Sequence, residues 1–251
     1  MSEFILYDAA NSPCGRRVRM TLLEKGQPFE IRWLNLGLMD QKQAWYLKLN
    51  PNGLVPTLLH GEKVLFESNV INEYLDAVLP SPKLIPDSAD LQAQMRMWMA
   101  YELEWAKPFR EAIYQTYGKS RLRQTGISEE KLASEVKKRT SNTVYEKMAI
   151  KNLREEKNET LLDTSIAILM ERIGWMEEQL KDERLWLLGD QFSLADIALA
   201  PRLDLFSLIE VSDFYQRFPK IEQYMDRIKN RDSWQRSGVL PDSDLRRVMI
   251  E

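Results

Sequence analysis

Short apolar runs and one amphipathic segment alternate at the beginning of the chain. Phe4–Tyr7 is an apolar run that fits a buried strand, and Phe29–Trp33 alternates with the period of two that is typical of a half-buried strand. Between them, Ser12 is placed to cap a helix and Pro13 to occupy its first position, while Gly26 is a typical signal for its end. The pattern therefore predicts a strand, a helix and a second strand.

This first helix has an apolar side and a charged side. The apolar residues that we expect to face the core are Val18, Leu22 and Leu23. The charged residues that we expect to face solvent are Arg16, Arg17 and Glu24. The two sets together predict an amphipathic helix that covers one face of a sheet.

Two more helices and a hairpin complete this region. Helical spacing covers Gln41–Leu49, and the proline and glycine of residues 50–53 end it in a turn. Val55–Leu59 and Lys63–Phe66 are predicted to form a tight hairpin, and Ser68 to cap a third helix. The buried face of that helix is predicted to carry Val70, Ile71, Tyr74, Leu75 and Val78. The predicted order is βαβαββα, an α/β domain over residues 1–79.

The remainder of the chain is predicted to be all-α. Prolines punctuate residues 80–88, which we interpret as a linker, and no convincing strand follows in residues 89–251. One helical stripe consists of Trp98, Tyr101, Trp105, Phe109, Ile113 and Tyr117. Another consists of Leu162, Ile166, Leu169, Ile173, Met176 and Leu180.

Two local signals add detail to this helical region. The charged segment 119–160 carries sparse apolar residues at helical spacing, which predicts a partly solvated helical excursion. Ser193 and Asp196 have the spacing of a capping box, with Phe192 and Ile197 placed as its hydrophobic staple. We interpret the capping box as a helix start with no chemistry attached.

Composition excludes several classes of function. A formal net charge of −3 gives no global field for nucleic acid or an anionic membrane, so we predict neither as a partner. The one cysteine, Cys14, cannot form a disulfide within the chain, and the one histidine, His60, cannot supply a His-rich zinc site or a Ser-His-Asp triad. We therefore predict no metal. The isolated glycines also exclude a GxGxxG or P-loop phosphate site.

The compartment is predicted from the same features. The apolar stretch near the amino terminus is too short for a signal peptide, and nowhere do 18 apolar residues run together. We therefore expect a cytoplasmic protein.

Ser12 and Cys14 lie where a helix start favours negative charge. Unpaired amides and the helix dipole at that end attract an anion, and a thiolate is the anion that these side chains suggest. If the thiolate belongs to a ligand, Ser12 donates a hydrogen bond to it; if it belongs to Cys14, the protein is itself a thiol reagent. A plain helix cap at Ser12 and a small buried residue at Cys14 are the structural alternatives.

Two further segments add weak signals for a ligand. Glu67-Ser68 at a helix start could bind the ammonium and carboxylate groups of an amino-acid end. Val55-Pro56 at a strand start is compatible with a cis bond and with an edge whose main chain pairs with an extended peptide. Each segment alone is an ordinary cap or turn.

In combination, these motifs resemble a known family. They are Asn11-Ser12-Pro13-Cys14 with Arg17-Val18-Arg19, residues 50–56, Glu67-Ser68 with Ile71 and Tyr74-Leu75, and Ser193-Leu194-Ala195-Asp196. The chain resembles the soluble glutathione transferases over nearly its whole length. The resemblance implies a thioredoxin-like domain over residues 1–79 and an all-helical domain from residue 89, a cytosolic homodimer and a role in detoxification.

The resemblance also implies roles for individual residues. Ser12 would stabilise the glutathione thiolate, Val55 would pair its main chain with the glutathione cysteine, and Pro56 would be cis. Glutathione binding is assigned to Lys42, Leu54, Val55, Pro56, Glu67 and Ser68, with Lys42 at the glycine carboxylate and Glu67-Ser68 at the γ-glutamyl group. Tyr7 ends a strand and is interpreted as structural.

The class within the family is narrowed by the same motif. Residues 12–19 are similar to the serine-type motif of zeta-class enzymes, whereas omega-class enzymes have a catalytic cysteine where Ser12 stands. Ala10-Asn11-Ser12, Glu24-Lys25-Gly26 and the segment around Thr125-Gly126 also resemble bacterial lignin β-aryl-etherases.

These observations predict a transferase that acts on a hydrophobic, aromatic electrophile, with β-aryl ether cleavage as one form of the reaction. The predicted pocket residues are Trp98, Tyr101, Trp105, Phe109 and Tyr117, for which core packing is the alternative. Trp234, Val239 and Leu240 could close the pocket. Two rival functions stay open: a Cys14-dependent thiol transferase or dehalogenase, and a non-catalytic glutathione-fold binding module.

Overall fold

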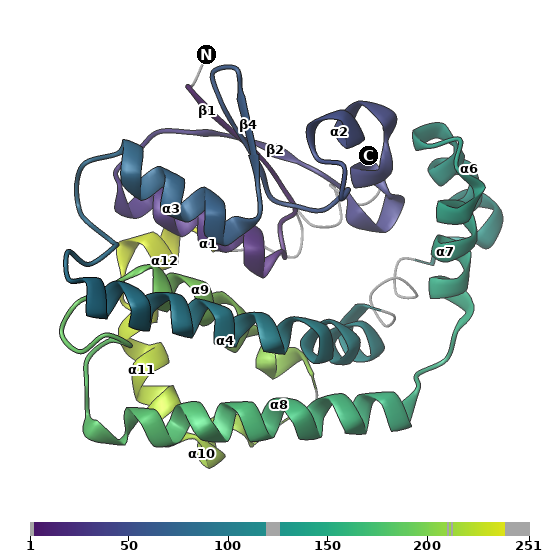
Figure 1. Cartoon of the computed structure of the whole chain (residues 1–251). Helices are drawn as coiled ribbons and strands as arrows, with labels where there is room; N and C mark the ends of the chain where they lie inside the picture. Colours follow the sequence, from purple (N-terminus) through teal and green to yellow (C-terminus); the bar gives the residue numbers. More distant parts are fainter. Residues whose placement is uncertain (1–2, 119–125, 210, 212, 239–251) are drawn as a thin grey trace.

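The computed structural model describes residues 3–118, 126–209, 211 and 213–238. Its amino-terminal part is a four-stranded sheet with helices on both faces (Figure 1). The elements are β1 (Phe4–Asp8), α1 (Pro13–Glu24), β2 (Glu30–Trp33), η1 (Leu36–Leu38), η2 (Asp40–Lys42), α2 (Ala44–Leu49), β3 (Thr57–His60), β4 (Lys63–Phe66) and α3 (Ser68–Val78). The predicted order βαβαββα is confirmed, with the second helical segment divided into η2 and α2.

The strand order of the sheet is β2-β1-β3-β4. β1 is parallel to β2, whereas β1 with β3 and β3 with β4 are antiparallel. The hairpin prediction is confirmed, but β3 begins at Thr57 rather than Val55 and lies inside the sheet. Both sides of β3 are paired from Thr57 onward, so a free main chain is confined to the turn before the strand, at Val55-Pro56.

Alternation along the strands divides the buried residues between the two faces. Phe4 and Leu6 of β1 and Leu58 of β3 pack against α1 and α3, which lie between the sheet and the helical domain (Figure 1). Tyr7 packs on the opposite face with Tyr46 of α2. On α3, the stripe is narrower than predicted: its buried apolar residues are Ile71 and Leu75, whereas Val70 and Val78 are exposed.

The carboxy-terminal part is helical, as predicted. Its elements are α4 (Ala89–Ile113), η3 (Tyr114–Gly118, a π-helical segment), α6 (Glu129–Arg139), α7 (Thr143–Arg154), α8 (Glu159–Gln179), η4 (Leu180–Asp182), α9 (Leu194–Asp204), η5 (Leu205–Leu208), α10 (Phe214–Arg217), α11 (Pro219–Lys229) and α12 (Asp232–Arg236). Its main core is formed by residues of α4, α8, α9 and α11. None of the helices in the described part of the chain is long and apolar enough to cross a membrane.

The predicted capping box starts α9, the central helix of this core. The Ser193 hydroxyl accepts a hydrogen bond from the Ala195 amide at 3.2 Å, and Asp196 accepts one from the Ser193 amide at 2.8 Å. Asp196 also accepts hydrogen bonds from the Leu187 amide and the Tyr224 hydroxyl. Burial raises the pKa of Asp196 to about 6 despite these bonds. Asp196 thus joins three segments of the core, which is the structural role expected for it.

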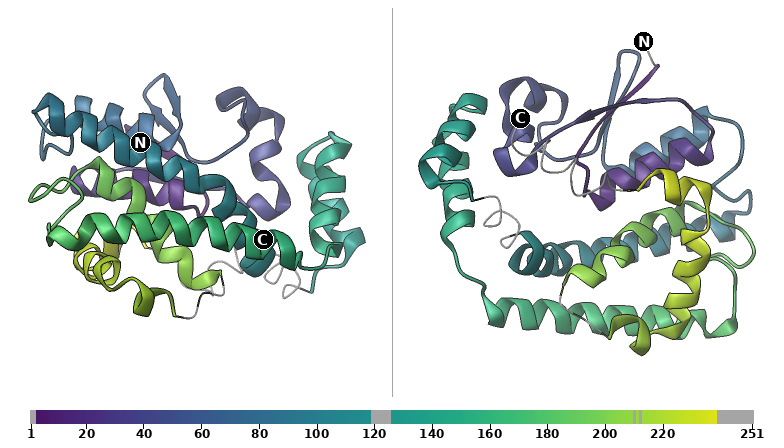
Figure 2. Two further views of the ribbon diagram at one scale, coloured as in Figure 1. Left: turned by 60° about the horizontal axis from the view of Figure 1, so that its bottom comes forward. Right: turned by 180° about the vertical axis from the view of Figure 1, so that it is seen from behind.

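The predicted excursion is a helical hairpin of α6 and α7. It stands at one end of the molecule beside the segment that carries η1, η2 and α2, as the views in Figure 2 show from two further sides. Leu132 and Val136 of α6 are buried in a cluster of their own, separate from the main core of the helical domain. Residues 119–125, which include Thr125 of the predicted etherase-like segment, lie outside the described residues.

Candidate active site at the amino end of α1

Three chain segments meet at one end of the sheet. Tyr7 of β1 pairs with Thr57 of β3, and Thr57 pairs with Phe66 of β4. Because β1 runs antiparallel to β3, the segment after β1, the segment before β3 and the segment after β4 all leave the sheet at this end. These are the segments that carry Ser12, Val55-Pro56 and Glu67-Ser68. The fold therefore brings together the motifs that the sequence presents far apart.

Ser12 caps α1 as predicted. Its Oγ accepts a hydrogen bond from the Gly15 amide at 3.0 Å, and Pro13 occupies the first position of the helix. The side chain is only half-buried. Since the hydroxyl oxygen serves as the acceptor in the cap, its proton is available to donate to a ligand at the helix end, where the dipole favours an anion.

Cys14 is half-buried in the first turn of α1, two residues after Ser12. The charge interaction with Cys14 is one of the causes that raise the pKa of Arg17, three residues further along α1. Because residues three apart are neighbours on a helix, Cys14 and the buried Arg17 lie on the same side of α1. A buried inert cysteine, the structural alternative from the sequence, does not describe this position.

The turn before β3 presents unused main-chain groups. The Val55–Pro56 peptide bond is cis. The carbonyl of Leu54 accepts hydrogen bonds from the Tyr46 hydroxyl at 2.6 Å and the Asn50 amide nitrogen at 2.9 Å, which hold the turn in place. Within the described residues, neither the amide nor the carbonyl of Val55 makes a hydrogen bond. Val55 is thus free to pair with the main chain of a peptide ligand.

Glu67 and Ser68 differ in detail from the prediction. The residue at the cap position of α3 is Glu67, with φ at +70°, and Ser68 is the first residue of the helix, so the prediction of Ser68 as the cap was wrong. The Ser68 hydroxyl instead accepts a hydrogen bond from Arg17 at 3.4 Å. The exposed carboxylate of Glu67 accepts one from the Asn52 side chain, also at 3.4 Å. Asn52 was not singled out in the sequence, where it reads as an ordinary turn residue.

Lys42 contacts the turn that contains Asn52. Its Nζ donates a hydrogen bond to the carbonyl of Asn52 at 3.1 Å, and partial burial lowers its pKa. A Cβ on Gly53, which has φ at +56°, would lie 2.6 Å from this Nζ, so glycine leaves room for the ammonium group. Lys42, Asn52 and Glu67 thus follow one another along one side of the site.

The arginines of α1 are buried rather than exposed. Arg16 and Arg17, predicted to face solvent, are 7% and 1% exposed, because the helical domain covers this side of α1. Arg16 pairs with Asp204 at 2.9 Å and stacks on Trp234, its guanidinium carbon lying 3.5 Å from the ring centroid. Glu24 pairs with Arg231 at 2.8 Å and is also only half-exposed. The charged side of the helix is therefore its contact with the second domain.

Arg17 connects the site to the helical domain, because it contacts both Ser68 and Glu102. It pairs with Glu102 of α4, which is fully buried and also pairs with Arg202 of α9. Burial by itself raises the pKa of Glu102, but the two guanidinium groups lower it below its ordinary value. For Arg17, burial lowers the pKa, and the attraction of Glu102 and Cys14 outweighs it and raises the pKa. The Ser68 hydroxyl is therefore held by a cation that stays charged.

A buried carboxylate lies beneath the first turn of α1. Asp8 ends β1, accepts a hydrogen bond from the Ala9 amide at 2.7 Å and pairs with Arg19. Burial raises its pKa to about 6, although Arg19 opposes the shift. A Cβ on Gly15 would overlap this carboxylate, so only glycine fits there. Sequence reasoning missed Asp8 because it reads as the polar end of a strand.

The aromatic stripe of α4 is core for most of its length. Trp98, Trp105 and Phe109 are buried in the main helical core, so the prediction that they line a pocket between the domains was wrong. Trp105 and Phe109 contact Phe206, and the Tyr101 hydroxyl donates to the Arg172 carbonyl on α8 at 2.7 Å. The stripe faces α8 and η5 because those helices supply the apolar partners that its large rings need. Tyr117, in η3 beyond the end of α4, is half-buried.

Two remaining predictions concern the tail and metals. Trp234 stacks on Arg16 within the domain contact, and Val239 and Leu240 lie outside the described residues. In the part of the chain that the structure describes, no group of three His, Cys, Asp or Glu side chains could hold a metal ion.

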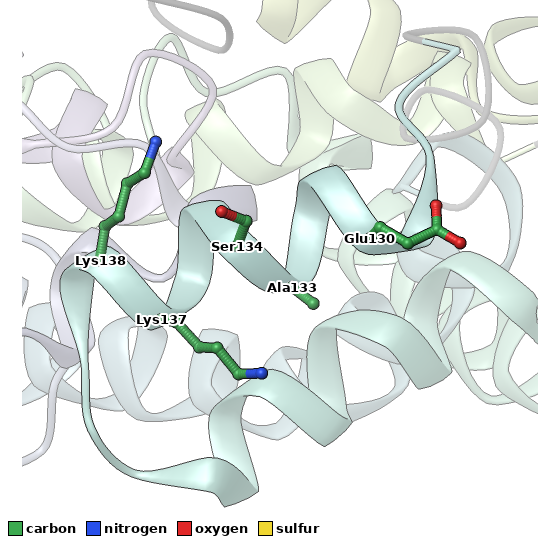
Figure 3. Close-up of a pocket in the computed structure, with 5 residues that line it drawn as sticks. All are labelled: Glu130, Ala133, Ser134, Lys137 and Lys138. Carbon is green, nitrogen blue, oxygen red and sulfur yellow. The ribbon is translucent and has the colours of Figure 1, made fainter.

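A separate pocket of about 620 Å³ lies on the hairpin (Figure 3). It is lined by residues of α6 alone: Glu130, Ala133, Ser134, Lys137 and Lys138. None of the predicted site residues belongs to it.

Comparisons with known proteins agree with the motifs of the sequence. The chain matches the family model described as glutathione S-transferase, N-terminal domain, over residues 11–78 and that described as glutathione S-transferase, C-terminal domain, over residues 128–232. Glutathione S-transferase A of Pleuronectes platessa is 27% identical over 232 residues, which cover 91% of this chain and 88% of that protein. Protein LigF of Sphingobium sp. is 30% identical over 179 residues, which cover 70% of this chain and 68% of LigF.

Among solved structures, the β-etherase LigF from Sphingobium sp. strain SYK-6 aligns with a TM-score of 0.79 and 25% sequence identity. The alignment covers 94% of this chain and 98% of that one. The similarity therefore extends through both the sheet-containing part and the helical part.

Proposed function

The chain belongs to the glutathione S-transferase family, and we propose that Ser12 stabilises the thiolate of bound glutathione for attack on an electrophile. Glutathione is the co-substrate of this family. The observation that carries the proposal is the half-buried Ser12 hydroxyl, which uses only its oxygen in the cap of α1 and keeps its proton at the positive end of the helix. A thiolate placed there accepts a hydrogen bond from that hydroxyl.

The energies suffice for this role. Lowering the pKa of a thiol from about 8.5 by two units requires about 2.7 kcal/mol. A helix end contributes up to about 2 kcal/mol and a hydrogen bond to a charged group about 1.5–3 kcal/mol. Ser12 and the first turn of α1 together can therefore hold the thiolate near neutral pH.

The other segments fit the remaining parts of glutathione. The unpaired main chain of Val55 pairs with the main chain of the cysteine, and Leu54 and Pro56 hold that turn in shape. The Glu67 carboxylate takes the ammonium group of the γ-glutamyl end, while Ser68, fixed by Arg17, takes its carboxylate. Lys42 takes the carboxylate of the glycine.

Titration calorimetry with glutathione tests this arrangement. Ser68→Ala is expected to weaken binding by about 1–3 kcal/mol, because the hydroxyl meets a charged group. Ser88→Ala is a matched control, since Ser88 is exposed at the start of α4 and makes no side-chain cap. Folded protein that gives no heat at millimolar glutathione would exclude the proposal.

We propose that the second substrate is aromatic, with cleavage of a β-aryl ether as the reaction to test first. The support is the similarity to LigF, which is named a β-etherase. Turnover of β-aryl ethers, aryl halides and disulfides with glutathione should rank the aryl ethers first. Equal rates for aryl and alkyl halides, with no cleavage of aryl ethers, would exclude an aromatic preference.

A second candidate function uses Cys14 as the nucleophile of a thiol transferase. The observation in its favour is that Cys14 is half-buried in the first turn of α1, three residues before the buried Arg17 and therefore on the same side of the helix. A mixed disulfide between Cys14 and glutathione, found by mass spectrometry during turnover, would support it.

We also propose that the protein is a homodimer. Val70 of α3 and Met97 of α4 are 55% and 71% exposed, and the Arg96–Glu73 ion pair joins these two helices beside them. A second copy would cover this apolar surface. Light scattering of the purified protein tests it, and Met97→Lys should favour the monomer.

The cytoplasmic location and the role in detoxification remain predictions.

A further inference from the structure

The α6–α7 hairpin packs on the segment that carries Lys42. Leu132, Val136 and Ala149 of the hairpin form one buried cluster with Leu38 and Met39, which lie just before η2. This cluster is separate from the main core of the helical domain. The apolar contact of the hairpin is thus made with the loop of the amino-terminal domain.

An ion pair joins the same two segments. Arg139, the last residue of α6, donates from Nε to Asp40 at 2.7 Å, and both side chains are less than one-fifth exposed. Asp40 also accepts hydrogen bonds from the Asn35 amide at 2.7 Å and from the Gln43 side chain at 3.1 Å. Asp40 thereby fixes both ends of the loop from residue 35 to residue 43, and Arg139 fixes Asp40.

Lys42 itself meets the hairpin. Its Nζ lies 5.5 Å from the centroid of the Tyr145 ring on α7, within the range of a cation–π contact. The only hydrogen bond of Nζ within the described residues goes to the Asn52 carbonyl. An ammonium group has three donors, so two remain for a carboxylate.

We propose that the α6–α7 hairpin is a clamp that positions Lys42 for the glycine carboxylate of glutathione, with Arg139 and Tyr145 as the positioning residues. This inference rests on the proposed binding of glutathione. Arg139 sets the loop through Asp40, and the Tyr145 ring contacts the ammonium group that also donates to the Asn52 carbonyl. The hairpin is then part of the specificity for the third residue of the tripeptide.

Comparison of two ligands isolates this effect. γ-Glutamylcysteine has the γ-glutamyl group and the thiol of glutathione but ends at the cysteine, so it lacks the glycine carboxylate that Lys42 is proposed to bind. A variant that only loosens the fold should weaken both ligands alike. A variant that misplaces Lys42 should weaken glutathione alone.

The experiment is titration calorimetry of both ligands with the full-length protein. Arg139→Gln and Tyr145→Leu are expected to raise the Kd for glutathione roughly 3- to 10-fold and to leave the Kd for γ-glutamylcysteine unchanged. Tyr145→Phe keeps the aromatic ring and should bind like the wild type. Lys42→Met should bind the two ligands with nearly equal affinity.

Arg154→Gln is the matched control. Within the described residues, the hydrogen bonds and the ion pair of the Arg154 side chain all go to Glu129 of the same hairpin. In the Arg154→Gln variant, the ratio of the Kd for γ-glutamylcysteine to the Kd for glutathione should equal that of the wild type. Thermal unfolding of each variant confirms that the comparison is made on folded protein.

The possible failures are distinguishable. If the wild type does not bind glutathione, the proposed function is wrong. If the wild type prefers glutathione and Lys42→Met loses the preference, but Arg139→Gln and Tyr145→Leu keep it, the proposed function stands and the clamp is wrong. Equal weakening of both ligands by the hairpin variants would also overturn the clamp.

Discussion

The amino end of α1 and the buried side of the same helix differ in how their polar groups are used. At the amino end, Ser12 keeps a free hydroxyl proton and Cys14 is half-exposed. Along the side, Arg16 and Arg17 are buried and paired with acidic residues of the helical domain. One helix thus offers the Ser12 hydroxyl to a ligand at its end and ion-paired charges to the second domain along its length.

The difference shows how the site is supported. A hydrogen-bond donor that has no protein partner must be accessible to water until a ligand binds, because burying an unpaired polar group destabilises the folded state. The paired arginines can be buried because Glu102 and Asp204 face them. The two domains are therefore joined beneath the site by ion pairs, and the chemistry lies just above, at the helix end. Variants on the two sides should separate stability from thiolate chemistry.

The largest effect is expected from Glu102→Ala. This variant leaves Arg17 and Arg202 buried without their common partner, and loss of one member of a buried ion pair typically costs about 3–5 kcal/mol. Urea unfolding measures the cost. Arg236→Ala is the control, because its pair with Asp232 is exposed and should contribute less than about 1 kcal/mol. Equal stabilities for the two variants would contradict the assigned role of the buried side.

An intermediate effect is expected from Asp8 beneath the first turn. Its pKa is raised from 3.8 to about 6, so the folded state binds a proton more tightly than the unfolded state between these values. The stability that Asp8 contributes is therefore fully present below pH 4 and is lost as the pH rises through 6. Relative to Asp8→Asn, the wild type should lose about 1–3 kcal/mol between pH 4 and pH 7 in urea unfolding. A pH-independent difference would contradict the shift.

The smallest effect is expected from Cys14→Ala. If Ser12 stabilises an external thiolate, removal of the Cys14 thiol should change the turnover number by less than roughly threefold. Steady-state kinetics with glutathione in excess measures it. An inactive Cys14→Ala that still binds glutathione normally would transfer the role of nucleophile to Cys14 and favour the thiol transferase.

Local patterns in the sequence predicted the elements and the end of α1. The cap at Ser12, the hairpin and the capping box at Ser193 depend on neighbouring residues, so their signals lie within a few positions. The cap of α3 was assigned one residue too late. Glu67 has a positive φ, and glutamate is not a residue type that indicates this conformation in a sequence.

The burial of the charged side of α1 could not be predicted from such local patterns. Arg16 and Arg17 look like a solvated face, since charged residues are rarely buried, and their partners Glu102 and Asp204 lie on helices far along the chain. The same limit explains the aromatic stripe of α4. The periodicity shows that Trp105 lies on an apolar face of the helix. It does not show whether that face packs against Phe206, as in the structure, or against a substrate.

The measurement that tests the central claim most directly is the ultraviolet absorbance of the glutathione thiolate, bound to the protein, as a function of pH. For the wild type, the account predicts a thiol pKa about two units below the usual 8.5, and for Ser12→Ala a pKa about one to two units higher than in the wild type. Glu102→Ala, where folded, should keep the lowered pKa. An unchanged thiol pKa in Ser12→Ala would contradict the claim that Ser12 stabilises the thiolate.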